Sequence, residues 1–281
     1  MTIGIFHKLM RLVISIILFL ALASPSLHAQ SVGASMALEG RAAIARAATF
    51  LIARQRENGS WENSPALTSL AGQSLLAANS FLEDDNIARA SSLALSFVRT
   101  SPVDSCWREA VRLRLMLESE TQTDETTLRE ALSSLRQQSP PPSEGAVWLA
   151  DILLQLSRRL NATASLERLA DSSPHTSSEQ LALALMTANH TETSLKALYS
   201  AARTANPHKA AIGELYWGAR SFQACNAANL FPYDNWKADI IAALLDRQRG
   251  DGAWHREKQS EAQIILDSAL AIQTAVICLK D

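Results

Sequence analysis

The stretch RQRENGSW, at residues 54–61, decides the fold, because the chain repeats it almost two hundred residues later as RQRGDGAW, at residues 247–254. Each copy follows an apolar run with helical spacing and precedes another such run. A glycine inside each copy supplies the left-handed backbone that ends a helix. An internal repeat of this kind usually fixes the architecture, so the sequence predicts paired helices joined by similar loops.

Signals for helix starts follow both copies. After the first copy, Ser64 and Pro65 are typical of an N-cap followed by the first helical residue. After the second copy, the stretch SEAQ at 260–263 has the form of a capping box. A helix–loop–helix hairpin is therefore expected near each end of the chain.

Helical periodicity continues between the two copies, and no run of alternating β-branched residues indicates a sheet. Hairpins without a sheet bury their apolar faces against neighbouring hairpins, either in an open solenoid or in a closed ring. The sequence predicts six hairpins made of twelve helices, at 38–56, 65–80, 84–99, 103–118, 124–137, 144–160, 163–171, 177–189, 191–204, 208–226, 234–249 and 261–280.

The repeat resembles that of the squalene cyclase-like family of terpenoid cyclases and protein prenyltransferases. The family's repeat contains a basic residue, a glycine, an aromatic–aliphatic pair, a glutamine and then Gly-x-Trp. The first copy matches it with Arg46, Phe50, Leu51, Gln55, Gly59 and Trp61, and has Ala47 in place of the glycine. The second copy keeps Gln248, Gly252 and Trp254, but has Asp239 and Ala243-Leu244 at the other positions.

The resemblance implies an all-α fold, a single α/α toroid of about six helical hairpins with an inner and an outer circle of helices. It also implies that the glutamine and the tryptophan of each repeat brace the loops between the two circles. Trp61 and Trp254 are therefore expected to be structural residues.

The N-terminus has the pattern of a bacterial-type signal peptide. An apolar stretch at 12–23 is too short to span a bilayer and is followed by a Ser-Pro break. We predict a signal peptide at 1–29, with cleavage after Ala29 or alternatively after Ala23, and a toroid domain at 38–281. This predicts an exported protein, periplasmic or secreted, and an uncleaved anchor is the competing interpretation.

Charge excludes one class of partner. Lys8 and Arg11 are the charged residues of the signal segment, so removing it from the chain's 26 basic and 28 acidic residues leaves 24 and 28, a formal charge of −4. A nucleic-acid-binding protein needs a basic face. We therefore expect no nucleic-acid partner.

The zinc site of protein prenyltransferases is only partly matched. Asp104 and Cys106 fit the family's Asp-x-Cys element, but no histidine stands in the context of the third ligand, which a catalytic zinc site requires. Asp104 is equally well explained as the N-cap region of a helix. We predict no metal and no cofactor, with Asp104 and Cys106 as the candidate ligands if one is bound.

The acidic motifs of isoprenoid cyclases are missing from the sequence. The nearest cluster, at 83–85, stands at a predicted helix start, where acids offset the helix dipole. Glu214, Asp234 and Asp239 could face one another near a rim, as paired carboxylates do in glycosidases, but solvated surface acids explain them as well. Aromatic residues make up 6% of the chain, few for a cavity that stabilises carbocations.

The cysteines allow two interpretations. The chain has three, so at least one thiol stays free. Cys225 and Cys278 could form a bridge in an exported protein, or could be small buried apolar residues.

These observations favour a non-catalytic role. We expect an exported scaffold or binding protein for a segment of another exported or membrane protein, or for an apolar small molecule. The alternative is a divergent isoprenoid cyclase or prenyl-transfer enzyme, which would need acids or metal ligands converging on a central cavity.

Overall fold

Periodic apolar residues produce helices throughout the described chain, and the computed structural model is all-α there. It describes residues 32–102, 106–119, 125–137, 143–162, 166, 169, 176–187, 191–228, 230 and 235–280. The eleven helices in these ranges are α2 (Ala34–Ala53), α3 (Pro65–Leu82), α4 (Asp85–Thr100), α5 (Cys106–Glu118), α6 (Glu125–Gln137), α7 (Ser143–Arg159), α9 (Ser177–Thr187), α10 (Glu192–Thr204), α11 (Ile212–Ala227), α12 (Trp236–Arg247) and α13 (Glu261–Leu279).

Each of these helices lies within four residues of a predicted one at both ends. The helix predicted at 163–171 falls largely outside the described residues, as does the predicted signal peptide at 1–29. Val32–Lys280 forms one compact unit.

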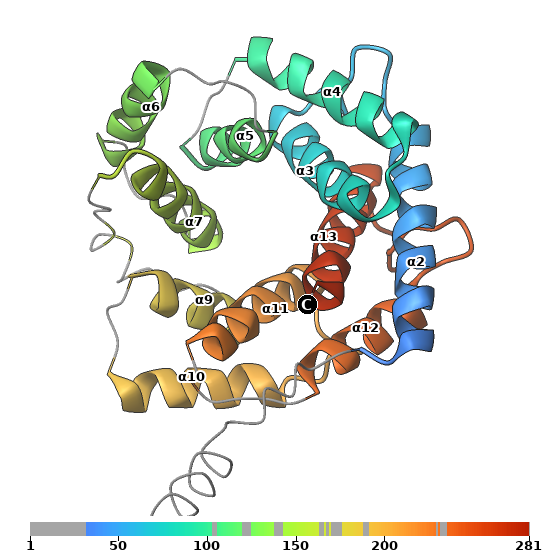
Figure 1. Cartoon of the computed structure of the whole chain (residues 1–281), viewed down its shortest axis with the longest axis vertical. Helices are drawn as coiled ribbons and strands as arrows, with labels where there is room; N and C mark the ends of the chain where they lie inside the picture. Colours follow the sequence, from blue (N-terminus) through green and yellow to red (C-terminus); the bar gives the residue numbers. More distant parts are fainter. Residues whose placement is uncertain are drawn as a thin grey trace, which may run out of the picture. The chain divides into compact units, whose positions relative to one another are not determined.

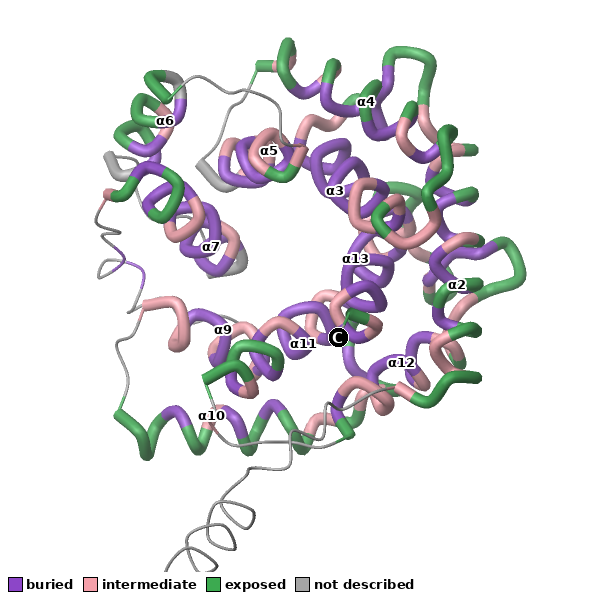
Figure 2. Tube along the Cα trace, viewed as in Figure 1, coloured by how far each residue is buried: buried purple, intermediate pink, exposed green. Residues whose placement is uncertain are grey.

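The helices divide into two sets by their contacts. In the first set α3 packs against α5, α5 against α7, α7 against α9, α9 against α11, α11 against α13, and α13 against α3. These helices lie toward the centre of Figure 1, and α2, α4, α6, α10 and α12 lie at the periphery. Burial agrees, because α3 and α13 are buried on nearly all sides, whereas α4 buries a single stripe (Figure 2). A helix that is apolar all round belongs in the interior.

The two repeat loops are built in the same way. The Gln55 side chain donates from Nε2 to the carbonyl of Gly59 in its own loop, at 2.9 Å, and to the carbonyl of Ala90 on α4, at 2.8 Å. The Gln248 side chain donates to the carbonyl of Gly252, at 2.9 Å, and to a carbonyl of α2, at 2.8 Å. Thus the first loop is fastened to α4 and the second to α2.

The repeat tryptophans are buried and hold the preceding helix. The Trp61 indole N–H donates to the carbonyl of Leu51 at 2.9 Å, and that of Trp254 donates to the carbonyl of Leu244 at 2.7 Å. Their backbone amides donate to hydroxyl groups on the following helix. Both indoles are almost fully buried, so the predicted structural role of the two tryptophans is confirmed.

Glycine is required in both loops. Gly59 has φ +86° and Gly252 has φ +90°. A Cβ on Gly59 would lie 2.4 Å from the carbonyl oxygen of Leu93, and one on Gly252 would lie 2.6 Å from that of Arg46. At these two positions the backbone of the loop lies so close to α4 or α2 that a residue with a side chain would not fit.

The first and last hairpins lie side by side, as expected. The Ser74 hydroxyl on α3 donates to the carbonyl of Ala269 on α13, at 2.8 Å. The Gln273 side chain on α13 donates to the Ser74 hydroxyl at 3.0 Å and to the carbonyl of Leu70 at 3.4 Å. These buried polar groups are thereby satisfied between the two helices.

The predicted helix starts are mostly correct. Ser64 caps α3 by accepting from the amide of Leu67, and Asp84 caps α4, so the acidic cluster at 83–85 serves a helix start. Ser260 caps α13, but the structure shows only this half of the predicted capping box. The Gln263 side chain is hydrogen-bonded to Asp267, to which its Nε2 donates at 2.8 Å.

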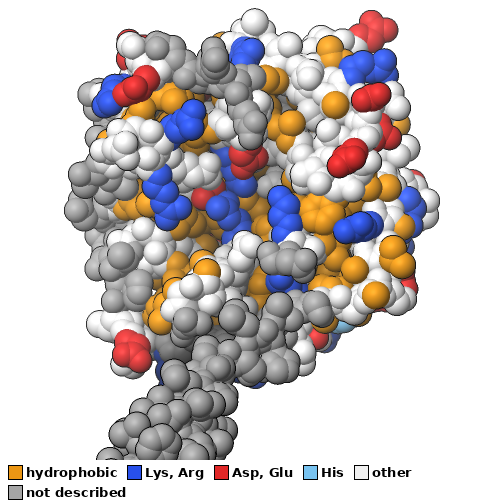
Figure 3. Space-filling view, in the orientation of Figure 1, with side chains coloured by type: hydrophobic (Ala, Val, Ile, Leu, Met, Phe, Trp, Pro, Cys, Tyr) orange, Lys and Arg blue, Asp and Glu red, His pale blue; other side chains and the backbone are white. Residues whose placement is uncertain are grey.

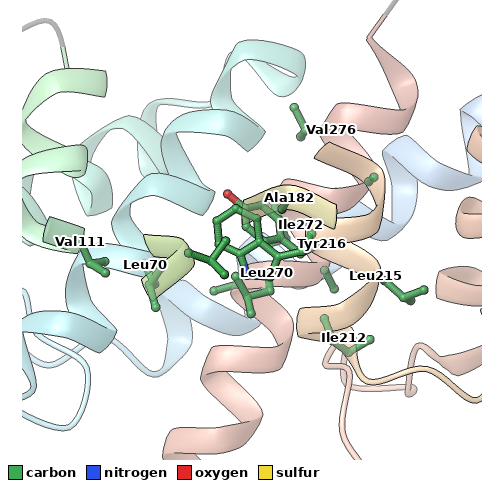
Figure 4. Packing of buried hydrophobic residues seen from close by; sticks show 14 of the residues in the cluster. Leu70, Val111, Ala182, Ile212, Leu215, Tyr216, Leu270, Ile272 and Val276 are labelled. Carbon is green, nitrogen blue, oxygen red and sulfur yellow. The ribbon is translucent and has the colours of Figure 1, made fainter. Parts of the chain in front are cut away.

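The apolar side chains form one main core, which runs from α2 to α13. Figure 4 shows side chains of α3, α5, α9, α11 and α13 meeting in it. Among the described helices, α13 is long and apolar enough to cross a membrane, but 61% of its apolar window is buried inside the protein. This burial is typical of the core helix of a globular domain.

Candidate functional site

A buried cluster of charged side chains joins four helices of the inner set. Asp151 on α7 accepts two hydrogen bonds from Arg220 on α11, at 2.7 and 2.8 Å. It also lies 3.4 Å from Arg114 on α5. Asp151 is 3% exposed and Arg114 is 8% exposed. One carboxylate thus lies between two guanidinium groups inside the helical core.

Polar groups around Arg114 complete the cluster. Its guanidinium donates to the Tyr216 hydroxyl at 2.6 Å, to the Glu118 carboxylate at 2.7 Å and to the Gln273 side-chain oxygen at 3.5 Å. Arg220 donates to the same Tyr216 hydroxyl at 3.1 Å. We call the set Arg114, Glu118, Asp151, Tyr216, Arg220 and Gln273 the charged network.

Three aromatic side chains from α7 and α11 lie beside the charged network. Trp148 stacks on Tyr216 with ring centroids 5.5 Å apart and meets Trp217 edge-on at 4.8 Å. The guanidinium carbon of Arg114 lies 5.8 Å from the centroid of the Trp148 ring, and that of Arg220 lies 5.5 Å from that of Trp217. The aromatic faces are thus already occupied by cations.

The arginines and the aspartate of the charged network stabilise one another's charged forms. Burial alone would raise the pKa of Asp151, but the charges of Arg220 and Arg114 outweigh burial, so this pKa is lowered. Burial likewise opposes the charge of Arg114, yet Tyr216, Glu118 and Asp151 raise its pKa. Asp151 therefore holds no proton that it could give to a substrate at neutral pH.

One side of the charged network reaches solvent. The Glu118 side chain is 34% exposed and that of Arg220 is 27% exposed, and Trp148 is partly exposed. Figure 3 shows the face over the inner helices hollowed, with basic and acidic side chains among hydrophobic ones. A molecule in this hollow would meet hydrophobic, basic and acidic side chains together.

The structure tests the predicted site residues only in part. Asp104, Asp234 and the side chain of Cys106 lie outside the described residues. Glu214 on α11 and Asp239 on α12 both line a small pocket of about 30 Å³ between α9, α10, α11 and α12, so these two predicted neighbours are brought together. Among the described residues, no three potential metal ligands of the His, Cys, Asp and Glu types cluster.

Cys225 and Cys278 are buried free thiols, so the interpretation as small core residues is correct and a bridge between them is not formed. Burial raises the pKa of Cys225 to about 11 and raises that of Cys278 further. Neither thiol is activated as a nucleophile.

Sequence reasoning missed the charged network. Its members come from four helices that are far apart in sequence, and each looks like an ordinary helical residue. The available signal was a charged residue inside an apolar helical run, such as Asp151 in WLADILL or Arg114 in VRLRLML. The low aromatic content of the chain was also misleading, because Trp148, Tyr216 and Trp217 gather at one place.

Comparison with known proteins found no match to this chain among family models, curated proteins or solved structures.

Proposed function

We propose that this chain is an exported, non-catalytic α/α toroid that binds a segment of another protein in the hollow beside the charged network. The proposal rests on the charged network. Its Arg220 and Glu118 side chains are partly exposed, whereas Asp151 is buried and paired.

Two features support a closed toroid of six hairpins. The inner helices contact one another in an order that returns to its start, since α13 packs against α3. The second repeat loop is fastened to α2 in the way that the first is fastened to α4, with Ala43 and Ala90 as equivalent acceptors. In an open solenoid no outer helix would lie next to the last loop, so its glutamine would lack this acceptor.

A protein segment suits the hollow better than an apolar molecule does. Tryptophan, tyrosine and arginine are the residue types most enriched where protein interfaces derive their binding energy. A peptide supplies backbone donors and acceptors for the exposed parts of the Arg220 and Glu118 side chains. An apolar ligand would bury these charges without hydrogen-bond partners.

Isoprenoid cyclisation fits the site poorly. Protonating an alkene needs a strong acid, and Asp151 is an ionised carboxylate between two arginines. Aromatic faces stabilise a carbocation only where they are free, and here Arg114 and Arg220 lie over them. The adjacent positive charges would repel a cationic intermediate.

Selection of a displayed random-peptide library on the purified protein tests the proposal. Selected peptides should bind with affinities that Trp148→Ala and Glu118→Lys weaken by about tenfold or more, as for central interface residues. Leu38→Ala, at an exposed position on α2, is the control and should leave binding unchanged.

Peptides that bind both hollow variants as well as the unchanged protein would place the binding surface elsewhere. A parallel assay with squalene and prenyl diphosphates, and metal analysis of the protein, test the enzymatic alternative. A cyclised or prenylated product, or one zinc per chain lost on Cys106→Ala, would overturn the non-catalytic role.

A further inference from the structure

The two repeat loops share a backbone but differ in how their arginines are paired. In the first loop Arg54 forms an ion pair with Glu261 at 2.6 Å and lies 3.7 Å from the centroid of the Phe50 ring. Arg56 forms an ion pair with Glu62 at 3.3 Å. Both arginines of this loop are therefore neutralised by carboxylates.

The second loop leaves the equivalent arginines without carboxylate partners. Arg247 donates from one nitrogen, Nη1, to the backbone carbonyls of Pro207 and Ala210, at 3.2 and 2.8 Å. Arg249 makes one long contact, 3.5 Å from Nε to the carbonyl of His255. In the described part of the chain, neither is within ion-pair distance of an acidic side chain.

A third arginine joins them. Arg256 lies on the same loop, is exposed, and donates from Nη2 to the carbonyl of Lys209 at 3.3 Å. Its charge lies near enough to Arg247 to lower the pKa of Arg247, to which burial contributes more. The charges of Asp267 and Asp246 act in the opposite direction and offset part of this effect.

These arginines line a pocket of about 410 Å³, formed by the second loop, the end of α12 and the start of α11. Its volume is in the range of small-molecule sites. Its floor includes Trp254 and Ile212. Three acidic side chains also line it. Asp246 lies 3.3 Å from His208, Asp267 accepts from two glutamine amides, and Glu257 is exposed.

We propose that this pocket binds the oxyanion group, a carboxylate or a phosphate, of a small molecule through the guanidinium groups of Arg247, Arg249 and Arg256. Each of the three has nitrogen atoms with no hydrogen bond to a described residue, and a guanidinium binds an oxyanion with two parallel hydrogen bonds. The site is separate from the hollow at the charged network and does not depend on the proposed function.

Isothermal titration of the purified protein with inorganic phosphate and with succinate tests the site. We expect saturable binding of at least one probe, and the tighter of the two identifies the oxyanion. Arg249→Gln and Arg256→Gln should each weaken that binding by roughly 10- to 100-fold, the effect of losing a charge-assisted hydrogen bond. Glu257→Gln should tighten it, because a nearby negative charge is removed.

The repeat provides the matched control. Arg56 occupies in the first loop the position of Arg249 in the second, and both are exposed. Arg56→Gln should leave phosphate and succinate binding unchanged. The proposal is overturned if neither probe binds at about 10 mM, where even a contact worth only ~3 kcal/mol is populated, or if Arg56→Gln weakens binding as much as Arg249→Gln does.

Discussion

Asp151 accepts hydrogen bonds from a guanidinium in the core, and this arrangement makes its removal costly. Asp151→Asn would leave Arg114 and Arg220 buried with one counter-charge fewer. We expect a loss of about 3–5 kcal/mol in the free energy of unfolding, measured by urea denaturation at pH 7. A loss below about 1 kcal/mol would show that the two arginines find other partners.

The same residue predicts how stability depends on pH. Its pKa is lower in the folded than in the unfolded protein, so the stabilisation is complete above the unfolded pKa, about 3.9 for an aspartate. It declines as pH falls below that value and disappears once pH passes the folded pKa. The stability difference between the unchanged protein and Asp151→Asn should therefore be constant from pH 6 to 8 and shrink below about pH 4. A difference that grows on acidification would contradict the assignment.

The repeat tryptophans allow packing and hydrogen bonding to be separated. Trp61→Ala and Trp254→Ala should each destabilise the protein by about 3–5 kcal/mol, because a fully buried ring leaves a cavity. Trp61→Phe and Trp254→Phe keep much of the volume but lose the indole hydrogen bond, and should cost less. Thermal melts compare the four variants, and equal losses for Ala and Phe would mean that the hydrogen bond dominates.

At the scale of single elements, the two repeat loops require a backbone conformation at glycine that other residues adopt only at a cost in stability. Gly252→Ala should destabilise by about 1–3 kcal/mol, because φ is +90° and its Cβ would meet the Arg46 carbonyl on α2. Gly250, two residues earlier, is the matched control, since a Cβ there meets nothing within 4 Å. Chemical denaturation of both variants checks this, and similar curves would show that the loop can move away from α2.

Elements were predictable from the sequence to the extent that local chemistry decides them. Gly59, Ser64 and Asp84 act within a few residues of their own position, so the helix ends that they set could be read directly. Only half of the capping box at Ser260 forms, and the Gln263 side chain lies instead against Asp267, one helical turn further on. Which neighbour such a side chain contacts depends on its rotamer, which the sequence does not specify.

The charged network could not be predicted because it exists only between elements. Arg114 and Asp151 come from different hairpins, and Gln273 lies at the other end of the chain. Helical periodicity places each of them on a buried face, but it does not say which faces meet. The contact between the second loop and α2, in which Gln248 donates to Ala43 across 205 residues, was not predicted either.

At the scale of the whole molecule, the proposed closed toroid would have no privileged starting point. Gly40 on α2 lies against Leu279 near the end of α13, so the two ends of the domain are neighbours. A permutant that joins Lys280 to Val32 by a flexible linker and begins at Glu125 should fold with a Tm within about 5 °C of the parent, because the added loop closure costs little. Circular dichroism and thermal melting test this.

A second permutant, opened inside the buried helix α13 between Ala271 and Ile272, is its control and should not fold. If both permutants unfold, the hairpins do not form a closed ring.

The contact between the second loop and α2 also delays folding during synthesis, because the two partners are synthesised at different times. Gln248 donates to Ala43 across 205 residues, and Gln273 reaches Leu70 across 203. At typical synthesis rates the partners of α2 and α3 emerge roughly 10 to 40 s after these helices themselves. During that interval α2 and α3 have only part of their burial, so a nascent chain in this condition exposes apolar surface to which chaperones bind.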